Sequence, residues 1–413
     1  MTQWLLAGVL LAPLAHSIQG AWLQGLLARQ ALLLSLSLAI GFVFCGLWIG
    51  ALALAAVVVW LFAGLLHHAA KSAGNARVRG MIWPAVLLAA VVLGWTRTET
   101  FVTQWTATQS SILTIPPLIA LVGTSYFLLR ALSLCFDARK GKLNEAPELL
   151  TTLNFLLFFP TLVSGPLDRY GRFRQDLVAP KTVDARAWDQ ALWRGVLGLF
   201  KKFVLANTLA LYALPVHLNA LESLSMADAW VAFYVWALVI YLDFSGYCDV
   251  AISVGRLLGF SVPENFRSPY FARSITEFWR RWHISLSEWL RDYVFLPSGL
   301  ALTRRLKGQS LLAGCVAALF TFSICGLWHG FEIHFLAWGL MHGGWVFAHK
   351  YYQDLSRSRL PKGWLTFTRQ SSVGHALCVL LTFHGVALSW VLFAAPDLQT
   401  AAQYIGVMLG VQR

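Results

Sequence analysis

Apolar segments recur along the whole chain and are separated by short polar or basic stretches. The earlier ones lie near residues 3–17, 31–48, 49–67 and 81–95, and between Pro116 and Cys135. The later ones lie near residues 149–177, 229–260, 311–330, 372–395 and 398–410. A helix of about 20 apolar residues crosses a bilayer, whereas barrel strands are shorter and alternate in polarity. The pattern therefore predicts an all-α polytopic membrane protein.

The composition agrees with this fold class. The chain has 413 residues, of which 58% are hydrophobic and 12% are charged, and its mean hydropathy is +0.62. Soluble domains carry roughly twice that charged fraction. The net charge of +13 comes from cations interleaved with the apolar segments, for example in residues 71–79 and 350–369. Cytoplasmic loops carry such an excess of Lys and Arg, so the charge predicts membrane topology and no nucleic-acid partner.

The stretch from Arg267 to Pro297 concentrates charge in an otherwise apolar chain. Its pattern predicts one amphipathic helix that starts at Ser274, with Glu277 completing a capping box. At helical spacing one face is apolar: Ile275, Phe278, Trp279, Trp282, Leu286, Trp289, Leu290 and Tyr293. The other face is charged: Glu277, Arg280, Arg281, Glu288, Arg291 and Asp292. His283 lies at the border, and such a helix either anchors at the membrane interface or enters the protein from it.

Two features of the earlier spans suggest buried polar structure. Arg130 lies inside a span, where an arginine is costly and should face protein or water. The span 149–177 is interrupted at Pro160 and again at Gly165-Pro166. Such breaks release backbone carbonyls, which at membrane depth are tolerated only inside protein or beside a cavity.

Two acids lie deep in the span 229–260, together with Ser245 and Tyr247. Asp243 and Asp249 are six residues apart and so point to different faces of a helix. We therefore favour a structural role, in which they hold Arg or Tyr partners from other helices, over a pair that acts as acid and base.

His329 stands at the end of an apolar span and is flanked by Gly326 and Gly330. This setting suits a reactive group that substrate approaches closely, and equally an interfacial histidine beside the belt tryptophan Trp328. The nearby His334 and His342 are expected either to support the site or to be structural. Two histidines, His283 and His329, make a weak case for zinc, so no metal is predicted. The six cysteines show no paired metal spacing and are interpreted as small core residues.

Four motifs carry a resemblance to a known family. FWRRWHISLSEWLRDY (278–293), GLWHG (326–330), SGPLDRYGRF (164–173) and GLFKKFVLANTLA (198–210) resemble motifs of the bacterial membrane-bound O-acyltransferases. The third motif is closer to the D-alanyl transfer branch than to the alginate branch. The chain also lacks the diglycine that the alginate branch has after the PSG at 297–299.

The resemblance implies a fold and an activity. The fold would be a ring of transmembrane helices, with re-entrant or interfacial helices, around a central funnel. One domain would cover residues 1–413, with N-terminal helices in 1–110, a core in 111–395 and a C-terminal segment in 396–413. The activity would be transfer of an acyl group, D-alanyl in this branch, from a thioester to a hydroxyl of a teichoic acid or similar cell-envelope polymer. The location would be the bacterial cytoplasmic membrane.

The resemblance also implies partners and residue roles. The donor thioester would be carried by the phosphopantetheine of a small acidic carrier protein, with no permanently bound cofactor. Membrane lipids, and a small membrane peptide or an extracytoplasmic transfer protein, are further expected partners. His329 would be the general base, and His283 would orient the acceptor or stabilise the oxyanion. Residues that line the substrate channel or support the histidines would be Trp282, Trp328, Asp243, Tyr247, Arg291 and Asp292.

The element 298–309 is the expected docking site for the carrier protein. Leu300 and Leu302 would be apolar contacts, and Arg304 and Arg305 would meet acidic charge. A basic anchor on the cytoplasmic side explains the same residues equally well.

Three other functions remain open. An O-acetyltransferase of an exported polysaccharide would use the same histidines. A transporter would also use intramembrane Asp, Arg and broken helices, but it would survive loss of His329. A non-enzymatic scaffold would bind a carrier protein without turnover.

Overall fold

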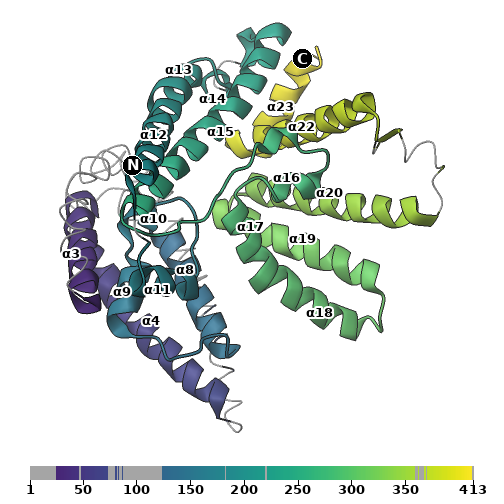
Figure 1. Cartoon of the computed structure of the whole chain (residues 1–413). Coiled ribbons are helices and arrows are strands. Elements are labelled where there is room, and N and C mark those ends of the chain that lie inside the picture. Colours follow the sequence, from purple (N-terminus) through teal and green to yellow (C-terminus); the bar gives the residue numbers. More distant parts are fainter. Residues whose placement is uncertain are drawn as a thin grey trace, which may run out of the picture. The chain divides into compact units, whose positions relative to one another are not determined.

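The computed structural model describes residues 25–45, 48–72, 80, 82, 86, 123–181, 183–218, 221–358, 361, 367–368 and 370–411. Every regular element within these residues is helical (Figure 1). Six described segments are long and apolar enough to cross a membrane: Leu26–Val43, Ile49–Lys71, Ala185–His217, Met226–Leu257, Ser310–His329 and Ser372–Ala394. The prediction of an all-α polytopic membrane protein is confirmed, while the ring around a funnel stays a prediction.

The chain divides into two compact units. The first is drawn from residues 1–199 and 247–263, and the second from residues 200–246 and 264–413. Helix α15 (Met226–Leu257) contributes to both. The predicted division of a single domain at residues 110 and 395 stays a prediction. The predicted span 3–17, most of 81–95, and Pro116-Pro117 lie outside the described residues.

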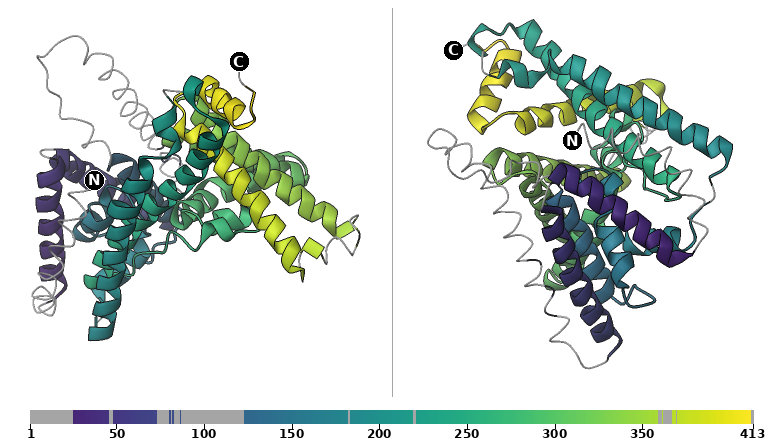
Figure 2. Two further views of the ribbon diagram at one scale, coloured as in Figure 1. Left: turned by 90° about the horizontal axis from the view of Figure 1, so that it is seen from above. Right: turned by 90° about the vertical axis from the view of Figure 1, so that its left-hand side faces the viewer.

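Two long helices of the first unit pack against shorter ones. The described helices that lie wholly in this unit are α3 (Leu26–Cys45), α4 (Trp48–Lys71), α8 (Thr124–Arg139), α9 (Leu149–Leu156), α10 (Phe159–Leu162), α11 (Tyr170–Val178) and α12 (Ala185–Leu199). Helix α4 contacts α8 and α9, and α3 lies beside α4 (Figure 2). The interruption predicted near Pro160 is confirmed, because α9 ends at Leu156 and α10 begins at Phe159.

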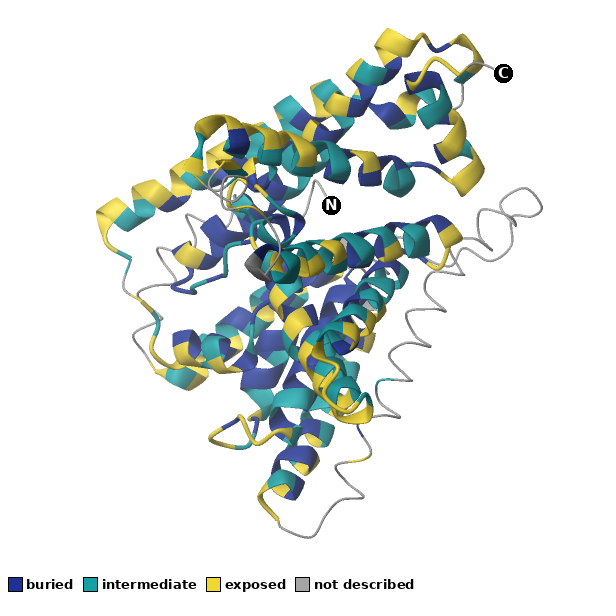
Figure 3. Ribbon diagram, turned by 90° about the vertical axis from the view of Figure 1, so that its right-hand side faces the viewer, coloured by how far each residue is buried: buried dark blue, intermediate teal, exposed yellow. Residues whose placement is uncertain are grey.

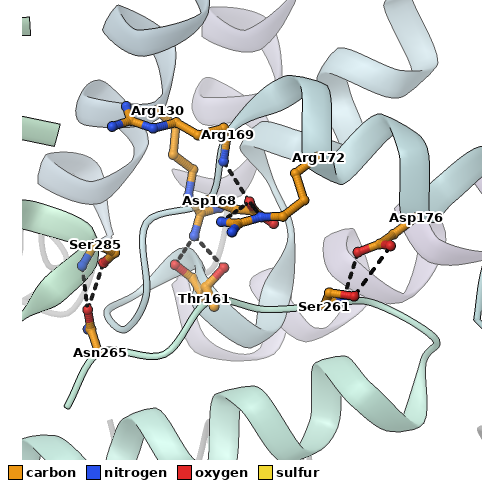
Figure 4. A network of polar contacts seen from close by, with 9 residues as sticks. All are labelled: Arg130, Thr161, Asp168, Arg169, Arg172, Asp176, Ser261, Asn265 and Ser285. Carbon is orange, nitrogen blue, oxygen red and sulfur yellow. Dashed lines mark hydrogen bonds and ion pairs between the residues drawn. The ribbon is translucent and has the colours of Figure 1, made fainter. Parts of the chain in front are cut away.

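Arg130 of α8 fills this interruption. Its side chain is 1% exposed, and its guanidinium donates to the backbone oxygens of Phe155 at 3.2 Å and Leu156 at 3.5 Å. It also bonds the backbone oxygen and hydroxyl of Thr161 (Figure 4). The arginine therefore caps the carbonyls that the broken helix leaves without intrahelical donors. The prediction that Arg130 faces protein is confirmed.

The second unit is built from three long helices and a group of short ones. The short ones are η1 (Phe200–Ala206), α13 (Asn207–Ala210), α14 (Leu214–His217), η2 (Leu221–Ser223), η3 (Pro269–Phe271), α16 (Ile275–Trp279), α17 (Ile284–Leu290), η4 (Arg291–Phe295), α18 (Leu296–Arg305) and α23 (Leu398–Met408). The long ones are α19 (Ser310–His329), α20 (Ile333–Ser358) and α22 (Ser372–Ala394). Helix α19 packs on both α18 and α20, and α20 also contacts α22 (Figures 1 and 2).

One exposed face of α4 is apolar. On α4, Leu54, Val58, Leu61 and Leu65 recur at helical spacing, and each is more than half exposed, the least being Leu61 at 53%. Figure 3 shows how exposed and buried residues alternate along the helices. A continuous apolar stripe on the outside of a helix is suited to lipid, since water would disfavour it.

The two deep acids of α15 are each paired with a cation. In the first unit, Asp249 accepts from Nε of Arg194 of α12 at 2.9 Å. In the second unit, Asp243 forms an ion pair with Lys202. Lys202 belongs to η1, a π-helical segment within the motif at 198–210. The expected pairing is confirmed for Asp249, whose partner is an arginine, whereas the partner of Asp243 is a lysine and not an arginine or tyrosine. That the acids have a structural and not a catalytic role stays a prediction.

Candidate active site

The pattern of the amphipathic stretch predicted one helix, but the structure has a break within it. Helix α16 ends at Trp279, and α17 begins only at Ile284. Between them His283 has φ 43° and ψ 52°, a left-handed conformation that is uncommon outside glycine. The predicted apolar face is nevertheless confirmed, because all eight of its residues are buried. Periodicity identified the buried side but not the break, since the break depends on contacts from elsewhere in the chain.

The start of α16 is capped as predicted, with one difference. The Ser274 hydroxyl accepts from the backbone N–H of Glu277 at 3.2 Å. The Glu277 carboxylate, however, accepts from the backbone N–H of Arg273 at 2.9 Å, one residue before the position that a capping box requires. Burial raises the pKa of Glu277, but hydrogen bonds from Arg273 and Arg281 outweigh it and lower the pKa overall.

Asn265 holds the break in place from outside the stretch. Its backbone oxygen accepts from the N–H of Ile284 at 3.0 Å. Its side-chain oxygen accepts from the N–H of Ser285 at 3.1 Å and from the Ser285 hydroxyl at 2.7 Å (Figure 4). These bonds satisfy donors at the first turn of α17, which have no intrahelical partner. Sequence analysis did not identify Asn265, because no local pattern indicates a partner 20 residues away.

His283 is buried and only partly satisfied. It is 4% exposed, and its Nδ1 lies 3.3 Å from Oδ1 of Asn265. Its ring packs edge-on against Phe244 of α15, with ring centroids 4.8 Å apart. Its Nε2 is buried and has no hydrogen-bond partner among the described residues. Burial, with a smaller effect from His329, lowers the pKa of His283 to about 3, so the imidazole is neutral at physiological pH.

His329 ends α19 and lies among aromatic rings. Its ring centroid is 4.9 Å from Phe393, 5.3 Å from Trp338 and 4.7 Å from its neighbour Trp328. The Trp328 ring also lies 6.4 Å from that of His283. The two predicted catalytic histidines therefore both contact Trp328, in the same unit. That Trp328 lines the substrate channel or supports the histidines stays a prediction, while Phe393 and Trp338 were missed because they come from other helices.

Glycines set the position of His329 by letting α19 and α20 touch. A Cβ on Gly326 would lie 2.2 Å from the backbone oxygen of Phe335, and one on Gly339 would lie 2.2 Å from that of Phe322. Both distances are far too short for any side chain. The sequence analysis related Gly326 to substrate access, but the structure shows that it serves helix packing.

Other predicted site residues lie in different environments. Trp282 is buried in an aromatic cluster, 5.5 Å from Phe278 and 5.1 Å from Trp390 between ring centroids. Tyr247 belongs to the first unit, where its ring lies against Gly165. Arg291 donates to its neighbour Asp292 at 2.9 Å, and the side chain of Arg291 is 56% exposed. An exposed pair of this kind contributes little to stability.

His342 and His334 have structural contacts. Nε1–H of Trp279 donates to Nδ1 of His342 at 3.3 Å, and Nε2 of His342 lies 2.9 Å from the Ser389 hydroxyl. Nδ1 of His334 donates to the backbone oxygen of Leu392 at 2.9 Å. His342 therefore has partners at both ring nitrogens, in contrast to His283. No group of three or more metal-ligating side chains occurs within the described residues.

The predicted docking element forms helix α18. Leu300 is 63% exposed, Leu302 is half-buried, and Arg304 and Arg305 are exposed. The helix packs along α19 and leaves Leu300 and the two arginines uncovered within the described residues.

Known proteins resemble this chain over most of its length. A probable alginate O-acetylase AlgI of Pseudomonas fluorescens is 34% identical over 289 residues, which are 70% of this chain and 54% of that protein. A teichoic acid D-alanyltransferase of Bacillus subtilis is 30% identical over 292 residues, which are 68% of this chain and 70% of that protein. A peptidoglycan O-acetyltransferase of Helicobacter pylori is 34% identical over 259 residues, covering 62% of this chain and 46% of that protein. The chain thus spans about half the length of the alginate O-acetylases that it matches.

The match to the family agrees with these similarities. The sequence profile of the membrane-bound O-acyltransferase family matches residues 80–393, a range that includes Asn265, His283 and His329. The chain therefore belongs to the membrane-bound O-acyltransferase family.

Proposed function

We propose that this protein transfers an acyl group from a thioester to a hydroxyl of a cell-envelope polymer. The observation that carries the proposal is the pair of histidines, His283 and His329, that both contact Trp328, and of which His283 has a buried ring nitrogen with no partner among the described residues. A buried polar atom of this kind costs free energy unless a substrate satisfies it. The names of the relatives support acyl transfer to alginate, teichoic acid or peptidoglycan.

In the proposed reaction His329 acts as the general base. An acceptor hydroxyl attacks the thioester carbonyl carbon while His329 takes its proton, since imidazole accepts protons near neutral pH. The tetrahedral intermediate collapses as the C–S bond breaks, and the proton passes to the departing thiolate. One thioester is exchanged for one ester, and the hydroxyl proton ends on the thiol.

We infer that the acyl group is D-alanyl. The motif SGPLDRYGRF and the missing diglycine after residue 299 favour this branch. Acetyl is the second candidate, favoured by the 34% identity to alginate O-acetylase against 30% to D-alanyltransferase. The donor would be the phosphopantetheine thioester of an acidic carrier protein that docks on α18, and the location would be the bacterial cytoplasmic membrane. A small membrane peptide or an extracytoplasmic protein would complete the transfer to the polymer.

Competition between two donors tests this proposal. Membranes containing the full chain would receive carrier protein loaded with D-alanyl or with acetyl thioester, together with teichoic acid or polysaccharide. We expect ester formation on the polymer and matching release of thiol, with D-alanyl preferred. Preference for acetyl would replace the inferred donor, and the absence of transfer from either thioester would overturn the proposed function.

A further inference from the structure

The amide of Asn265 can be oriented from its contacts alone. The backbone N–H of Ser285 lies 3.1 Å from the side-chain atom assigned as Oδ1. A backbone N–H only donates, so the atom that faces it must be the amide oxygen and not the nitrogen. The Ser285 hydroxyl, 2.7 Å from the same atom, donates to it as well. Asn265 is 0% exposed, so no solvent offers an alternative arrangement.

This orientation decides which ring nitrogen of His283 carries the proton. Nδ1 of His283 lies 3.3 Å from the same amide oxygen, which can only accept. The hydrogen bond therefore requires a proton on Nδ1. In a neutral imidazole with Nδ1 protonated, Nε2 has a lone pair and no proton. Nε2 is the atom that has no partner among the described residues.

We infer that Asn265 is a positioning residue for His283, which fixes the Nδ1-protonated tautomer and presents the Nε2 lone pair to a hydrogen-bond donor of the substrate. The inference rests on the proposed function for the nature of the substrate. It also decides between the two roles expected for His283. Stabilising an oxyanion needs a donor, whereas a bare Nε2 accepts, so His283 orients the acceptor.

His342 provides an internal comparison with the opposite tautomer. The indole of Trp279 can only donate, so Nδ1 of His342 accepts and carries no proton. Its Nε2–H donates to Ser389, whose hydroxyl donates in turn to the backbone oxygen of Val386 at 2.6 Å. Two buried histidines of one unit are thus held in opposite tautomers by partners of opposite kind.

The tautomers are measured directly by nitrogen NMR of the full chain, labelled with ¹⁵N-histidine and reconstituted in lipid nanodiscs. The resonances of His283 and His342 are assigned by their loss in His283→Asn and His342→Gln. We expect His283 to be protonated at Nδ1 and His342 at Nε2. Protonation of His283 at Nε2 would overturn the inference. This measurement needs no turnover, so it stands even if the proposed acyl transfer fails.

Variants of Asn265 test its positioning role. Asn265→Asp keeps an acceptor for both Ser285 and His283, and its charge should raise the pKa of the imidazole. We expect it to retain transfer and to move the acidic limb of the pH profile upward. Asn265→Leu removes the acceptor and should lower transfer roughly 10- to 100-fold, as loss of a residue that orients a histidine often does. Full activity and an unchanged tautomer in Asn265→Leu would contradict the inference.

Two variants of His283 test the contributions of Nδ1 and Nε2 separately. His283→Asn keeps a donor at the position of Nδ1 but has no atom at Nε2, and should fold without transferring. His283→Gln places an amide oxygen near the position of Nε2, and should retain measurable transfer. Equal loss in both well-folded variants would argue against an accepting role for Nε2.

Discussion

Lys202 of η1 forms an ion pair with Asp243 of α15, and the lysine is 5% exposed. The carboxylate side chain is 40% exposed, so the two partners differ in their access to solvent. Removing the acid leaves an ammonium group buried without its counter-charge, which is more costly than removing the lysine. The pair therefore holds η1 against α15, the helix that also provides Phe244 to the ring of His283.

The first prediction follows from this asymmetry. Asp243→Asn should destabilise the protein by up to about 3 kcal/mol, and adding Lys202→Met should restore most of that loss. Asp292→Asn is the matched control, because its exposed pair with Arg291 should contribute less than about 1 kcal/mol. Thermal unfolding in detergent measures the stability of the Asp243 variants and of the control. An Asp243→Asn protein of unchanged stability that no longer transfers acyl groups would instead place the acid in the chemistry.

Glycine packing between α19 and α20 gives the second prediction. Gly339→Ala would place a Cβ 2.2 Å from the backbone oxygen of Phe322, so the helices must separate and His329 must move. Since a displacement of about 1 Å can reduce a rate about 100-fold, transfer should fall by at least 10-fold. Gly344→Ala on α20 is the control, because nothing lies within 4 Å of its added Cβ. Equal activity of the two variants would show that the close contact does not position His329.

The pH dependence of stability gives the third prediction. His283 has a pKa of about 3 in the folded protein, against an ordinary value of 6.5 when unfolded. Between these values the unfolded chain binds a proton that the folded protein does not, so stability falls as the pH decreases from 6.5 toward 3. His283→Asn removes this contribution. Between pH 7.5 and 4.5 the melting temperature should therefore fall less steeply in His283→Asn than in the wild type. Parallel plots of melting temperature against pH for the two proteins would show that His283 is not buried as neutral imidazole.

Helix α18 gives the fourth prediction, which concerns the carrier protein. Leu300→Asp with Leu302→Asp should weaken carrier binding by speeding dissociation, whereas Arg304→Glu with Arg305→Glu should slow association and flatten its salt dependence. Immobilised carrier protein and detergent-purified variants provide the measurement. Arg186→Glu, an exposed cation of α12, is the control for charge alone. If both α18 variants bind as the wild type does, α18 is only a basic membrane anchor.

The sequence predicted those features of the fold that depend on local patterns. Five of the candidate spans, the buried face around Trp282, and the interruption near Pro160 follow from apolar runs and their exceptions. The candidate span Ala185–His217 was not predicted, and the predicted spans 149–177 and 398–410 form only short helices. The break at His283 did not follow, because the apolar periodicity continues through it. It is held by Asn265, which lies 18 residues earlier and whose role depends on tertiary contacts.

Only some residues of the candidate site could be predicted from the sequence. His283 and His329 became candidates because one lies at the border of an amphipathic face, the other follows an apolar span between glycines, and the motifs of both resemble a known family. Phe244, Trp338 and Phe393 could not, since a single aromatic residue in an apolar helix carries no signal of its own. The role inferred for His283 also needed the structure, because the inference rests on the contacts of Asn265.

Loss of His329 tests the central claim most directly. Full-length His329→Ala, inserted in membranes and supplied with acylated carrier protein and acceptor polymer, should lose transfer by about 100-fold or more, as expected for a general base. His375→Ala, a histidine of α22 that contacts Arg273, should transfer as the wild type does. Thiol release and ester formation are measured together. Wild-type rates in a well-inserted His329→Ala protein would contradict the account.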